Sequence, residues 1–335
     1  MNSLVRTRGH AASLAASMLA PNIGDLEVKR GAHVRAEPKV SVVIPAYRGR
    51  PDQPDWIDET LESIRAQTFG DYEIVVVDDG SPLRIEPART EDLVMVRQPN
   101  TGPGGARNVG SVIARGKLIA FIDADDRWRP TKLEKQVALH DRRPELVLTA
   151  TDFVHFDSKG FRDRPAWREK TRLRDEDVTF ERLFFENCIP CSSTMMRRSA
   201  LMKTPGMNRH RRMGEDYGLW LRLAMLGPVA FLDEPLMEHR VHEASLMQQQ
   251  TRDGTIEQRE REVYEEFLAE YPELRAKPFV KSTMARLDHD EGWTRLQRRE
   301  WPEARRLMLR SLRANPRKPK VWIDLARAVL RVRVA

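Results

Sequence analysis

Three aspartates that lie close together in the sequence are the residues best suited to chemistry. Asp123, Asp125 and Asp126 belong to the segment FIDADD, whose first residues continue the apolar run LIAFI. Unpaired carboxylates at the end of a buried strand are costly, and a hard cation such as Mg²⁺ or Mn²⁺ would neutralise them. Such a cation needs only one or two carboxylates when diphosphate oxygens complete its ligands. The alternative is that Asp126 caps a helix that begins after the turn RWRP.

Two further groups of polar residues also follow apolar runs. Asp78 and Asp79 end the segment EIVVVDD, and Pro45, Ala46 and Tyr47 end the segment VSVVIPAY. The two carboxylates suit the imide N–H of a base or the hydroxyls of a ribose, and the tyrosine offers an aromatic face for a base. The alternative is that DGS forms an ordinary turn. The pattern therefore indicates nucleotide-binding groups at the ends of two strands.

The glycine-rich segment NTGPGGARNVG opens a helical pattern. Backbone N–H groups at a helix start hold phosphate in dinucleotide-binding loops. Here the glycine spacing differs from G-x-G-x-x-G, and the segment follows the third strand and not the first. We therefore expect a loop that lines a diphosphate and contains Gly105, with Arg107 as a charge partner and Asn108 as a structural residue.

These polar residues need a common scaffold, and the apolar pattern supplies one. Four apolar runs alternate with helical patterns at Trp56–Gln67 and Ala106–Ala114. Continuously apolar runs between helices indicate a parallel sheet covered on both faces, which is the doubly wound α/β fold. Ligands of such sheets bind beyond the carboxyl ends of the strands, where the polar groups above fall. The four runs are Val40–Pro45, Glu73–Gly80, Leu93–Gln98 and Lys117–Asp126.

Composition limits the remaining possibilities. A chain of 335 residues with 40% apolar residues can form one large domain and a small appendage. The net charge of +7 is concentrated at the C-terminus, because residues 291–335 carry +9 and leave −2 for the rest. Cys188 and Cys191 are too few for a disulfide framework and indicate a reducing compartment. We expect both to be plain buried thiols.

The two ends of the chain differ from its centre. We expect residues 1–38 to be an extension with a short Ala-rich helix, residues 39–250 to form the main domain, and residues 251–335 to form a basic helical region. Helical patterns on both sides of the turn at Asn315 and Pro316 resemble one tetratricopeptide-like helix pair. These basic helices face either anionic lipid or solvent, and any membrane contact would be peripheral, since no apolar stretch approaches roughly 20 residues. No recognised module indicates binding of nucleic acid.

Five blocks of the sequence together resemble glycosyltransferase family 2, whose members have the GT-A fold. The blocks VSVVIPAY, QTFGDYEIVVVDDGS, NTGPGGARNVG, FIDADD and GEDYGLWLRL stand in the family's order between Lys39 and Ser245. The resemblance implies a doubly wound, mostly parallel sheet flanked by helices, inverting sugar transfer from a nucleotide-sugar donor, and Mn²⁺ or Mg²⁺ bound at Asp125. The donor-binding residues that the patterns and the resemblance indicate are Pro45, Ala46, Tyr47, Asp78, Asp79, Gly105, Arg107, Asp123 and Ala124.

The resemblance also indicates the catalytic base. Asp216, in GEDYGLWLRL, matches the carboxylate that deprotonates the acceptor hydroxyl, and Glu215 is the second candidate. An inverting displacement requires the base and the leaving group on opposite faces of the sugar, so a base outside FIDADD is expected. The alternative is that both carboxylates merely favour a helix start. His242, in HRVHEAS, either matches a histidine near the metal or diphosphate or is, like His239, a surface histidine.

The expected function is therefore inverting, metal-dependent transfer of a sugar to a hydroxyl of a saccharide or lipid-linked acceptor. The expected donor is in the first place a UDP-sugar, and the expected setting is cell-surface glycan biosynthesis. We expect the protein in the cytoplasm, or peripherally on the inner face of the plasma membrane. The segment PGMNRHRRMGED is basic where family members commonly carry a Gly-Gly-Phe-Asp-Glu-like stretch, which leaves the acceptor open. The alternatives are a nucleotidyltransferase, which would carry a basic Gly-rich first loop, and a nucleotide-sugar-binding scaffold, against which Asp123, Asp125 and Asp216 together argue.

Overall fold

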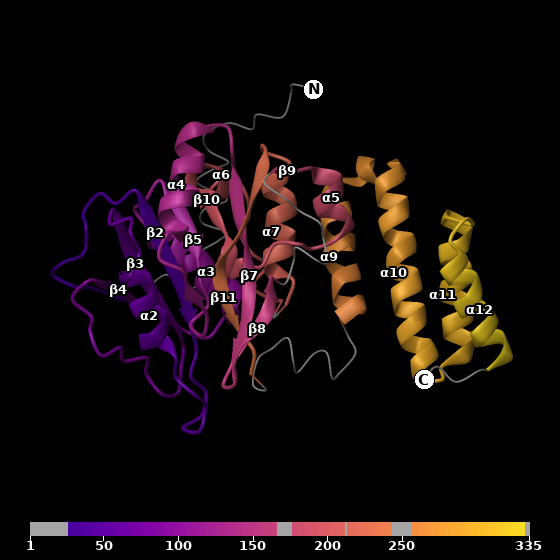
Figure 1. Cartoon of the computed structure of the whole chain (residues 1–335), viewed down its shortest axis with the longest axis horizontal. Coiled ribbons are helices and arrows are strands. Elements are labelled where there is room, and N and C mark those ends of the chain that lie inside the picture. The colour runs from indigo at the N-terminus through magenta and orange to yellow at the C-terminus, as the bar shows by residue number, and fades with distance from the viewer. Residues whose placement is uncertain (1–25, 166–175, 212, 243–255, 332–335) are drawn as a thin grey trace. The chain divides into compact units, whose positions relative to one another are not determined.

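The computed structural model of the protein describes residues 26–165, 176–211, 213–242 and 256–331 (Figure 1). The chain divides into two compact units. The first comprises residues 1–179 and 188–244, and the second comprises residues 180–187 and 245–335. Helix α5 (Phe180–Phe185) therefore belongs with the C-terminal helices, although the first unit surrounds it in the sequence.

The strands described in the first unit form one mixed, mostly parallel sheet flanked by helices, which confirms the predicted α/β fold. The order is β1-β4-β3-β2-β5-β10-β7-β11-β6, with β8 paired to β7 and β9 paired to β11. The strands are β1 (Glu27–Arg30), β2 (Val40–Ala46), β3 (Tyr72–Asp79), β4 (Leu93–Gln98), β5 (Leu118–Phe121), β6 (Arg127–Trp128), β7 (Leu148–Asp157), β8 (Gly160–Pro165), β9 (Glu176–Val178), β10 (Met195–Arg197) and β11 (Val229–Arg240).

Strands β2 to β5 form the parallel part that the four apolar runs predict. β2 lies between β3 and β5, β4 follows β3, and all of these pairs are parallel. Consecutive residues such as Val75, Val76 and Val77 are completely buried. A strand buries both of its alternating sets of side chains only where both faces of the sheet are covered. The carboxyl ends of β2, β3 and β5 consequently lie along one edge.

The other part of the sheet brings distant segments to that edge. β10 runs antiparallel between β5 and β7, with Met195 opposite both Ala120 and Thr149. β11 is parallel to β7, and its far end pairs antiparallel with β6, where Met237 lies opposite Trp128. The segment that follows β5 is therefore held beside the last residues of β11.

Helices of the first unit cover the sheet (Figure 1). They are α2 (Ile57–Arg65), α3 (Gly102–Ile113), α4 (Lys132–Arg142), α6 (Arg198–Leu201) and α7 (Glu215–Ala224), together with the 3-10 turn η2 (Cys191–Ser193). Helix α3 begins at Gly102, whereas the sequence pattern predicts a start at Ala106. Pro103 fits the first turn of a helix, but the glycines beside it make this turn resemble a loop in the sequence. It packs close to β2, since a Cβ at Gly110 would stand 2.4 Å from Val43 Cγ1.

The described part of the second unit is helical. Besides α5 it contains α9 (Ile256–Glu270), the 3-10 turn η3 (Pro272–Ala276), α10 (Pro278–Gln297), α11 (Trp301–Ala314) and α12 (Pro319–Leu330). On α5, the Phe184 ring lies 4.8 Å from the ring of Tyr264 and 5.4 Å from that of Phe279. Buried Asp324 on α12 meets His289 on α10 at 2.9 Å. The helices expected on both sides of the Asn-Pro turn are confirmed, and their tetratricopeptide-like arrangement stays a prediction.

Part of the expected N-terminal extension belongs to the sheet. β1 pairs antiparallel with β4, with Glu27 opposite Arg97. All four residues of β1 are exposed, so the sequence carries no apolar signal for this strand. The Ala-rich helix expected within residues 1–25 lies outside the described residues. No helix in the described part of the chain is long and apolar enough to cross a membrane.

Candidate functional site

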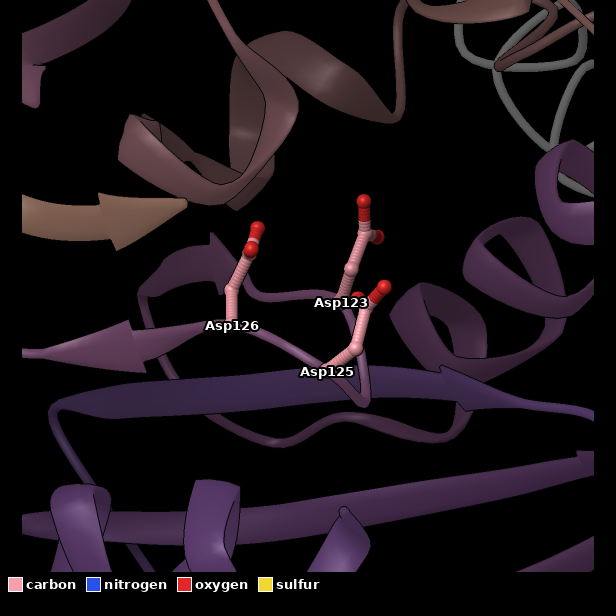
Figure 2. A group of neighbouring side chains, drawn as sticks. All are labelled: Asp123, Asp125 and Asp126. Carbon is pink, nitrogen blue, oxygen red and sulfur yellow. The ribbon is translucent and has the colours of Figure 1, made fainter. Parts of the chain in front are cut away.

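The acidic loop, residues 122–126, follows β5 and carries the three aspartates of FIDADD. Figure 2 shows the side chains of Asp123, Asp125 and Asp126 extending to the same side of this loop. One carboxylate oxygen from each lies within 4.8 Å of the others, and no other His, Cys, Asp or Glu trio in the described ranges comes as close. An all-oxygen donor set of this kind fits Mg²⁺ or Mn²⁺.

Asp126 differs from its two neighbours because it is only 2% exposed. Its Oδ1 accepts the backbone N–H of Arg240 at 3.0 Å. Burial and the adjacent charge of Asp125 raise the pKa of Asp126 well above its usual range. The interpretation of Asp126 as a helix cap is wrong, since α4 begins after Thr131 and Asp126 is bound to β11. Asp126 is therefore the member of the acidic loop whose carboxylate is bound to β11.

His242 lies at the acidic loop beside Asp125, and its role as a metal ligand stays a prediction. Its Nε2 stands 2.8 Å from Asp125 Oδ2. Its Nδ1 is buried and has no hydrogen-bond partner among the described residues, and its ring lies 4.6 Å from the ring of Trp56. His239 is also partly buried, with its Nδ1 3.1 Å from Nδ1 of His155. Neither histidine is a freely exposed surface residue.

Arg240, a residue that sequence analysis missed, ties the end of β11 to the acidic loop. Besides its backbone bond to Asp126, its Nε donates to the backbone oxygen of Asp125 at 2.8 Å. Its guanidinium lies 4.7 Å from the ring centroid of Trp56 and 4.4 Å from that of Phe156, and it pairs with Glu59. The same tryptophan ring packs on His242. Arg240 thus contacts both the acidic loop and Trp56, whose ring packs on His242.

The two aspartates at the end of β3 are buried and hold the neighbouring backbone. Asp78 pairs with Arg97 and accepts the N–H of Ser81 at 2.9 Å. Asp79 accepts the N–H groups of Thr101 at 2.9 Å and Gly102 at 2.8 Å, and burial raises its pKa. The Asp79 carboxylate is therefore bound to the first residues of α3. Direct contact of either aspartate with a base or ribose stays a prediction.

The residues after β2 include one exposed aromatic ring. Pro45 and Ala46 close the strand, and Tyr47 beyond them is 48% exposed. Gln53 donates to the backbone oxygen of Tyr47 at 3.0 Å, which fixes the turn. In the acidic loop, the backbone oxygen of Ala124 accepts the Thr60 hydroxyl at 3.0 Å. Tyr47 is thus free to present its ring to a base, while Ala124 shapes the loop.

Arg107 joins the acidic loop to helix α7. It is 4% exposed, pairs with Asp123, and donates from NH1 to Glu215 Oε1 at 2.9 Å. Burial alone would lower its pKa, but the charges of Asp123 and Glu215 outweigh burial and hold the pKa well above the usual range. Arg107 therefore stays charged and brings FIDADD and the Glu-Asp block together. Its expected contact with a diphosphate stays a prediction.

The other residues of the glycine-rich segment pack against the same block. Asn108 exchanges two hydrogen bonds of 2.8 Å with the backbone of Met207, so it is structural, as expected. A Cβ at Gly104 would stand 3.0 Å from Glu215 Cγ, and one at Gly105 would stand 2.2 Å from Thr101 Oγ1. Close packing explains these glycines, and contact of Gly105 with a donor stays a prediction.

Asp216 occupies the first turn of α7, directly after Glu215. Its Oδ1 accepts the N–H of Tyr217 at 2.7 Å. Burial and the neighbouring Glu215 raise the pKa of Asp216 to about 7. A carboxylate with a pKa near neutrality can take a proton from a hydroxyl and release it again under physiological conditions. The structure thus gives Asp216 the property that a general base needs.

Both cysteines are buried thiols, as expected. Cys191 lies on η2, where burial raises the pKa of its thiol well above the usual value. A thiol that stays protonated is a poor nucleophile and a poor metal ligand. We therefore assign the cysteines no chemistry.

Comparison with known proteins identifies relatives of this arrangement. The family model described as Glycosyl transferase family 2 matches residues 41–204. The amylovoran biosynthesis glycosyltransferase AmsE of Erwinia amylovora is 31% identical over 209 residues, which are 60% of this chain and 75% of AmsE. The putative teichuronic acid biosynthesis glycosyltransferase TuaG of Bacillus subtilis is 28% identical over 213 residues, or 61% of this chain and 80% of TuaG. A match to an uncharacterized glycosyltransferase of Rickettsia felis, 27% identical over 222 residues, covers 65% of this chain and 35% of that relative.

Solved structures share the fold. Residues 1–349 of Staphylococcus aureus TarS align with a TM-score of 0.58 and 19% identity over 87% of each chain, and this fragment has been solved in complex with UDP-GlcNAc. The mannosyltransferase PcManGT from Pyrobaculum calidifontis, solved with GDP-Man and Mn²⁺, aligns with a TM-score of 0.54 and 18% identity over 96% of this chain and 91% of PcManGT. Fold and site together define the class, a domain of the GT-A type. The chain belongs to glycosyltransferase family 2.

Proposed function

We propose that the protein transfers a sugar from a nucleotide-sugar donor, in the first instance a UDP-sugar, to an acceptor hydroxyl with inversion at the anomeric carbon. One observation carries this proposal: Arg107 contacts both Asp123 of the acidic loop and Glu215 beside Asp216. A cation-binding group and a near-neutral carboxylate are thereby parts of one connected site. Complexes of two similar structures with UDP-GlcNAc and with GDP-Man and Mn²⁺ support a nucleotide-sugar donor and a divalent cation.

The donor side of the proposed site is the acidic loop. Asp125 and His242 would hold Mn²⁺ or Mg²⁺, since Asp125 Oδ2 and His242 Nε2 face each other at 2.8 Å. The bound cation would supply Lewis-acid stabilisation of the departing nucleoside diphosphate. Asp123 binds ribose hydroxyls, and the exposed ring of Tyr47 stacks on the base. Arg240 keeps the loop in place through Asp125 and Asp126.

The acceptor side is the start of α7. The acceptor oxygen attacks the anomeric carbon, the bond from that carbon to the diphosphate oxygen breaks, and the hydroxyl proton goes to Asp216. Glu215 is less suited to this step because its carboxylate is buried and bound to Arg107. An Asp216 pKa of about 7 matches the task, since a base is most effective when its pKa lies near the working pH.

The names of the relatives suggest the biological setting. AmsE and TuaG are glycosyltransferases of amylovoran and, putatively, teichuronic acid biosynthesis. We accordingly place this protein in the assembly of a cell-surface polysaccharide, with a saccharide or lipid-linked acceptor, in the cytoplasm or at the inner face of the plasma membrane.

A binding panel tests the donor assignment without knowledge of the acceptor. Nucleotide sugars with different bases and sugars are screened by thermal shift with and without Mn²⁺. Ligand at about 100 times its Kd should raise Tm by roughly 5 °C or more, and only when Mn²⁺ is present. Asp125→Ala should abolish this shift, whereas the exposed control Asp141→Ala should keep it. An unchanged shift in Asp125→Ala, or a shift that is full in EDTA, would refute the metal assignment.

A product assay separates sugar transfer from the alternatives. A glycosyltransferase releases the nucleoside diphosphate from the donor, whereas a nucleotidyltransferase releases or consumes pyrophosphate. A scaffold binds the donor and releases neither. Detection of pyrophosphate as the product would overturn the proposed reaction even where the binding panel succeeds.

A further inference from the structure

Helix α12 has a second apolar face in addition to the one it buries. Val321, Leu325 and Ala328 pack into the core shared with α11. The outer face of α12, formed by Trp322, Ile323, Ala326, Val329 and Leu330, is exposed. At 3.6 residues per turn these side chains fall within roughly a third of the helix circumference, opposite the buried face. The outer face is therefore one continuous apolar surface.

This concentration of apolar side chains is unusual for the molecule. Ten large hydrophobic residues are exposed in the described part of the chain, and four of them, Trp322, Ile323, Val329 and Leu330, lie on the outer face of α12. Leu330 reaches 73% exposure. Isolated exposed apolar residues are normal on soluble proteins, whereas a contiguous group on one helix marks an interaction surface.

Cations without carboxylate partners accompany this face. The ion pairs described for α11 and α12 use Arg306, Arg310 and Arg327. The outer face is neighboured in the sequence by other cations that are exposed and form no ion pair with a described residue: Arg313, Arg317, Lys320 and Arg331. Residues 291–335 as a whole carry a net charge of +9. The surface is thus both apolar and strongly positive.

Trp322 lies where the two properties meet. Its indole Nε1 donates to the backbone oxygen of Pro316 at 2.9 Å, so the polar edge of the ring is directed to the basic turn before α12. Its ring is 51% exposed. A tryptophan with one polar edge and an apolar ring is favoured at the boundary between water and lipid.

We propose that the outer face of α12 and its neighbouring cations bind the surface of an anionic lipid bilayer. A second copy of this chain would bring the same positive charge to the contact and would be repelled. A bilayer with anionic headgroups satisfies both features, because the apolar side chains enter the headgroup boundary while the cations meet lipid phosphates. The described chain has no spanning helix, so the contact is peripheral. This proposal is independent of sugar transfer.

Vesicle sedimentation with the full-length protein tests the proposal. Vesicles of phosphatidylglycerol and phosphatidylethanolamine are compared with vesicles of phosphatidylcholine. The protein should sediment with the anionic vesicles only, and raising NaCl from about 0.1 M to about 0.5 M should weaken binding because salt screens the cations. A cation near an anionic surface strengthens binding by about fivefold. The charge variant Arg313→Glu, Arg317→Glu, Lys320→Glu should therefore bind roughly 100-fold more weakly or worse.

The apolar contribution has its own variant and matched controls. Trp322→Glu combined with Ile323→Glu should weaken vesicle binding at least about tenfold, because two exposed apolar side chains no longer enter the lipid. Leu226→Glu, at an exposed leucine of the first unit, and Lys281→Glu, at an exposed lysine of α10, should bind as the wild type does. All changed side chains are exposed, so the variants should keep their helices. Circular dichroism checks this.

Tryptophan fluorescence tests the position of Trp322 with the conservative change Trp322→Phe, which keeps an aromatic ring on the outer face of α12. Anionic vesicles should shift the emission of the wild type to shorter wavelength, and Trp322→Phe should lose most of that shift while it still sediments. Equal binding to both vesicle types, wild-type binding by both variants, or no binding at all would overturn the proposal. So would a dimer in sedimentation velocity that Trp322→Glu converts to a monomer, because a second copy would then cover this face.

Discussion

Four aspartates in two short blocks acquire different properties from their surroundings. Asp125 faces His242, and Asp123 faces the buried guanidinium of Arg107. The pKa of Asp126 is raised far above its usual range by burial, whereas that of Asp216 is raised only to about 7. Groups of one chemical type whose environments separate their pKa values can divide acid, base and ligand roles among themselves.

The pKa of Asp216 predicts how transfer depends on pH. Because the base acts as a carboxylate, kcat should rise with pH and level off above a midpoint near 7. Asp216→Asn should lower kcat by about 10²-fold or more while nucleotide binding by calorimetry stays intact. A profile that is flat between about pH 5 and pH 9, or turnover that survives in Asp216→Asn, would assign the base elsewhere.

The same pKa has a consequence for stability. An aspartate near its usual pKa in the unfolded chain binds fewer protons between about pH 4 and pH 7 than Asp216 does in the folded protein. Its contribution to stability is therefore present at low pH and is lost as the pH rises through about 7. Asp216→Asn should remove this decline from the free energy of unfolding measured by denaturant titration.

Substitution of Arg107 should cause a large loss of stability. Arg107→Met leaves the buried carboxylate of Glu215 without its cation, and the free energy of unfolding should fall by about 3–5 kcal/mol. Arg107→Met combined with Glu215→Gln should recover part of that loss, because the buried charge is then removed as well. Urea unfolding of the single and double variants measures both. A loss below about 1 kcal/mol in the single variant would show that the pair is not important for stability.

Sequence patterns indicate most of the candidate site residues but not the links among them. Asp125, His242, Arg107 and Asp216 are candidates because each lies in a recognisable block, and their roles stay predictions. Their pairing is invisible in the sequence, since Arg107 and Glu215 are 108 positions apart. The buried state of Asp126 and the role of Arg240 likewise depend on β11 reaching the acidic loop, which a one-dimensional pattern does not show.

At the scale of elements, helix α3 depends on close packing against β2. Alanine normally stabilises a helix relative to glycine, but a Cβ at Gly110 would stand 2.4 Å from Val43 Cγ1 and 3.1 Å from Val77 Cγ2. Gly110→Ala should therefore lower the free energy of unfolding by about 1–3 kcal/mol. Gly70→Ala is the control, since no atom lies within 4 Å of its Cβ position, and it should be neutral or slightly stabilising. Equal stability of the two variants would contradict the packing argument.

Arg240, the last residue of β11, should affect cation binding. This side chain supports the acidic loop at Asp125 and the ring of Trp56 behind His242. Arg240→Ala should weaken Mn²⁺ binding by about 10–100-fold in calorimetry. Arg129→Ala is a matched control, because Arg129 pairs with Glu238 of the same strand. A metal affinity equal in both variants would remove Arg240 from the support of the site.

Elements were predictable where burial is continuous and were missed where it is not. β2, β3 and β4 follow their apolar runs closely, because most of their residues are buried and a strand covered on both faces is largely apolar. β1 was missed because it is fully exposed and owes its conformation to pairing with β4. The first turn of α3 was missed because its glycines, needed for close packing, resemble a loop.

At the scale of the whole molecule, charge separates the chain into two parts with different tasks. Residues 291–335 carry +9, and the remainder, which includes the acidic loop and α7, carries −2. We assign donor binding and proton transfer to the first unit and contact with an anionic bilayer to the second. Variants of α12 should consequently leave donor binding unchanged, and variants of the acidic loop should leave vesicle binding unchanged.

The most direct test of the central claim is release of nucleoside diphosphate, with water accepting the sugar, from the nucleotide sugar that gives the largest thermal shift. With Mn²⁺ the wild type should release it, while EDTA, Asp125→Ala and Asp216→Asn should each reduce release by about 10²-fold or more. Asp141→Ala should retain wild-type release. Release by the wild type that continues undiminished in EDTA, or that is equal in Asp125→Ala, would contradict a metal-dependent glycosyl transfer centred on the acidic loop.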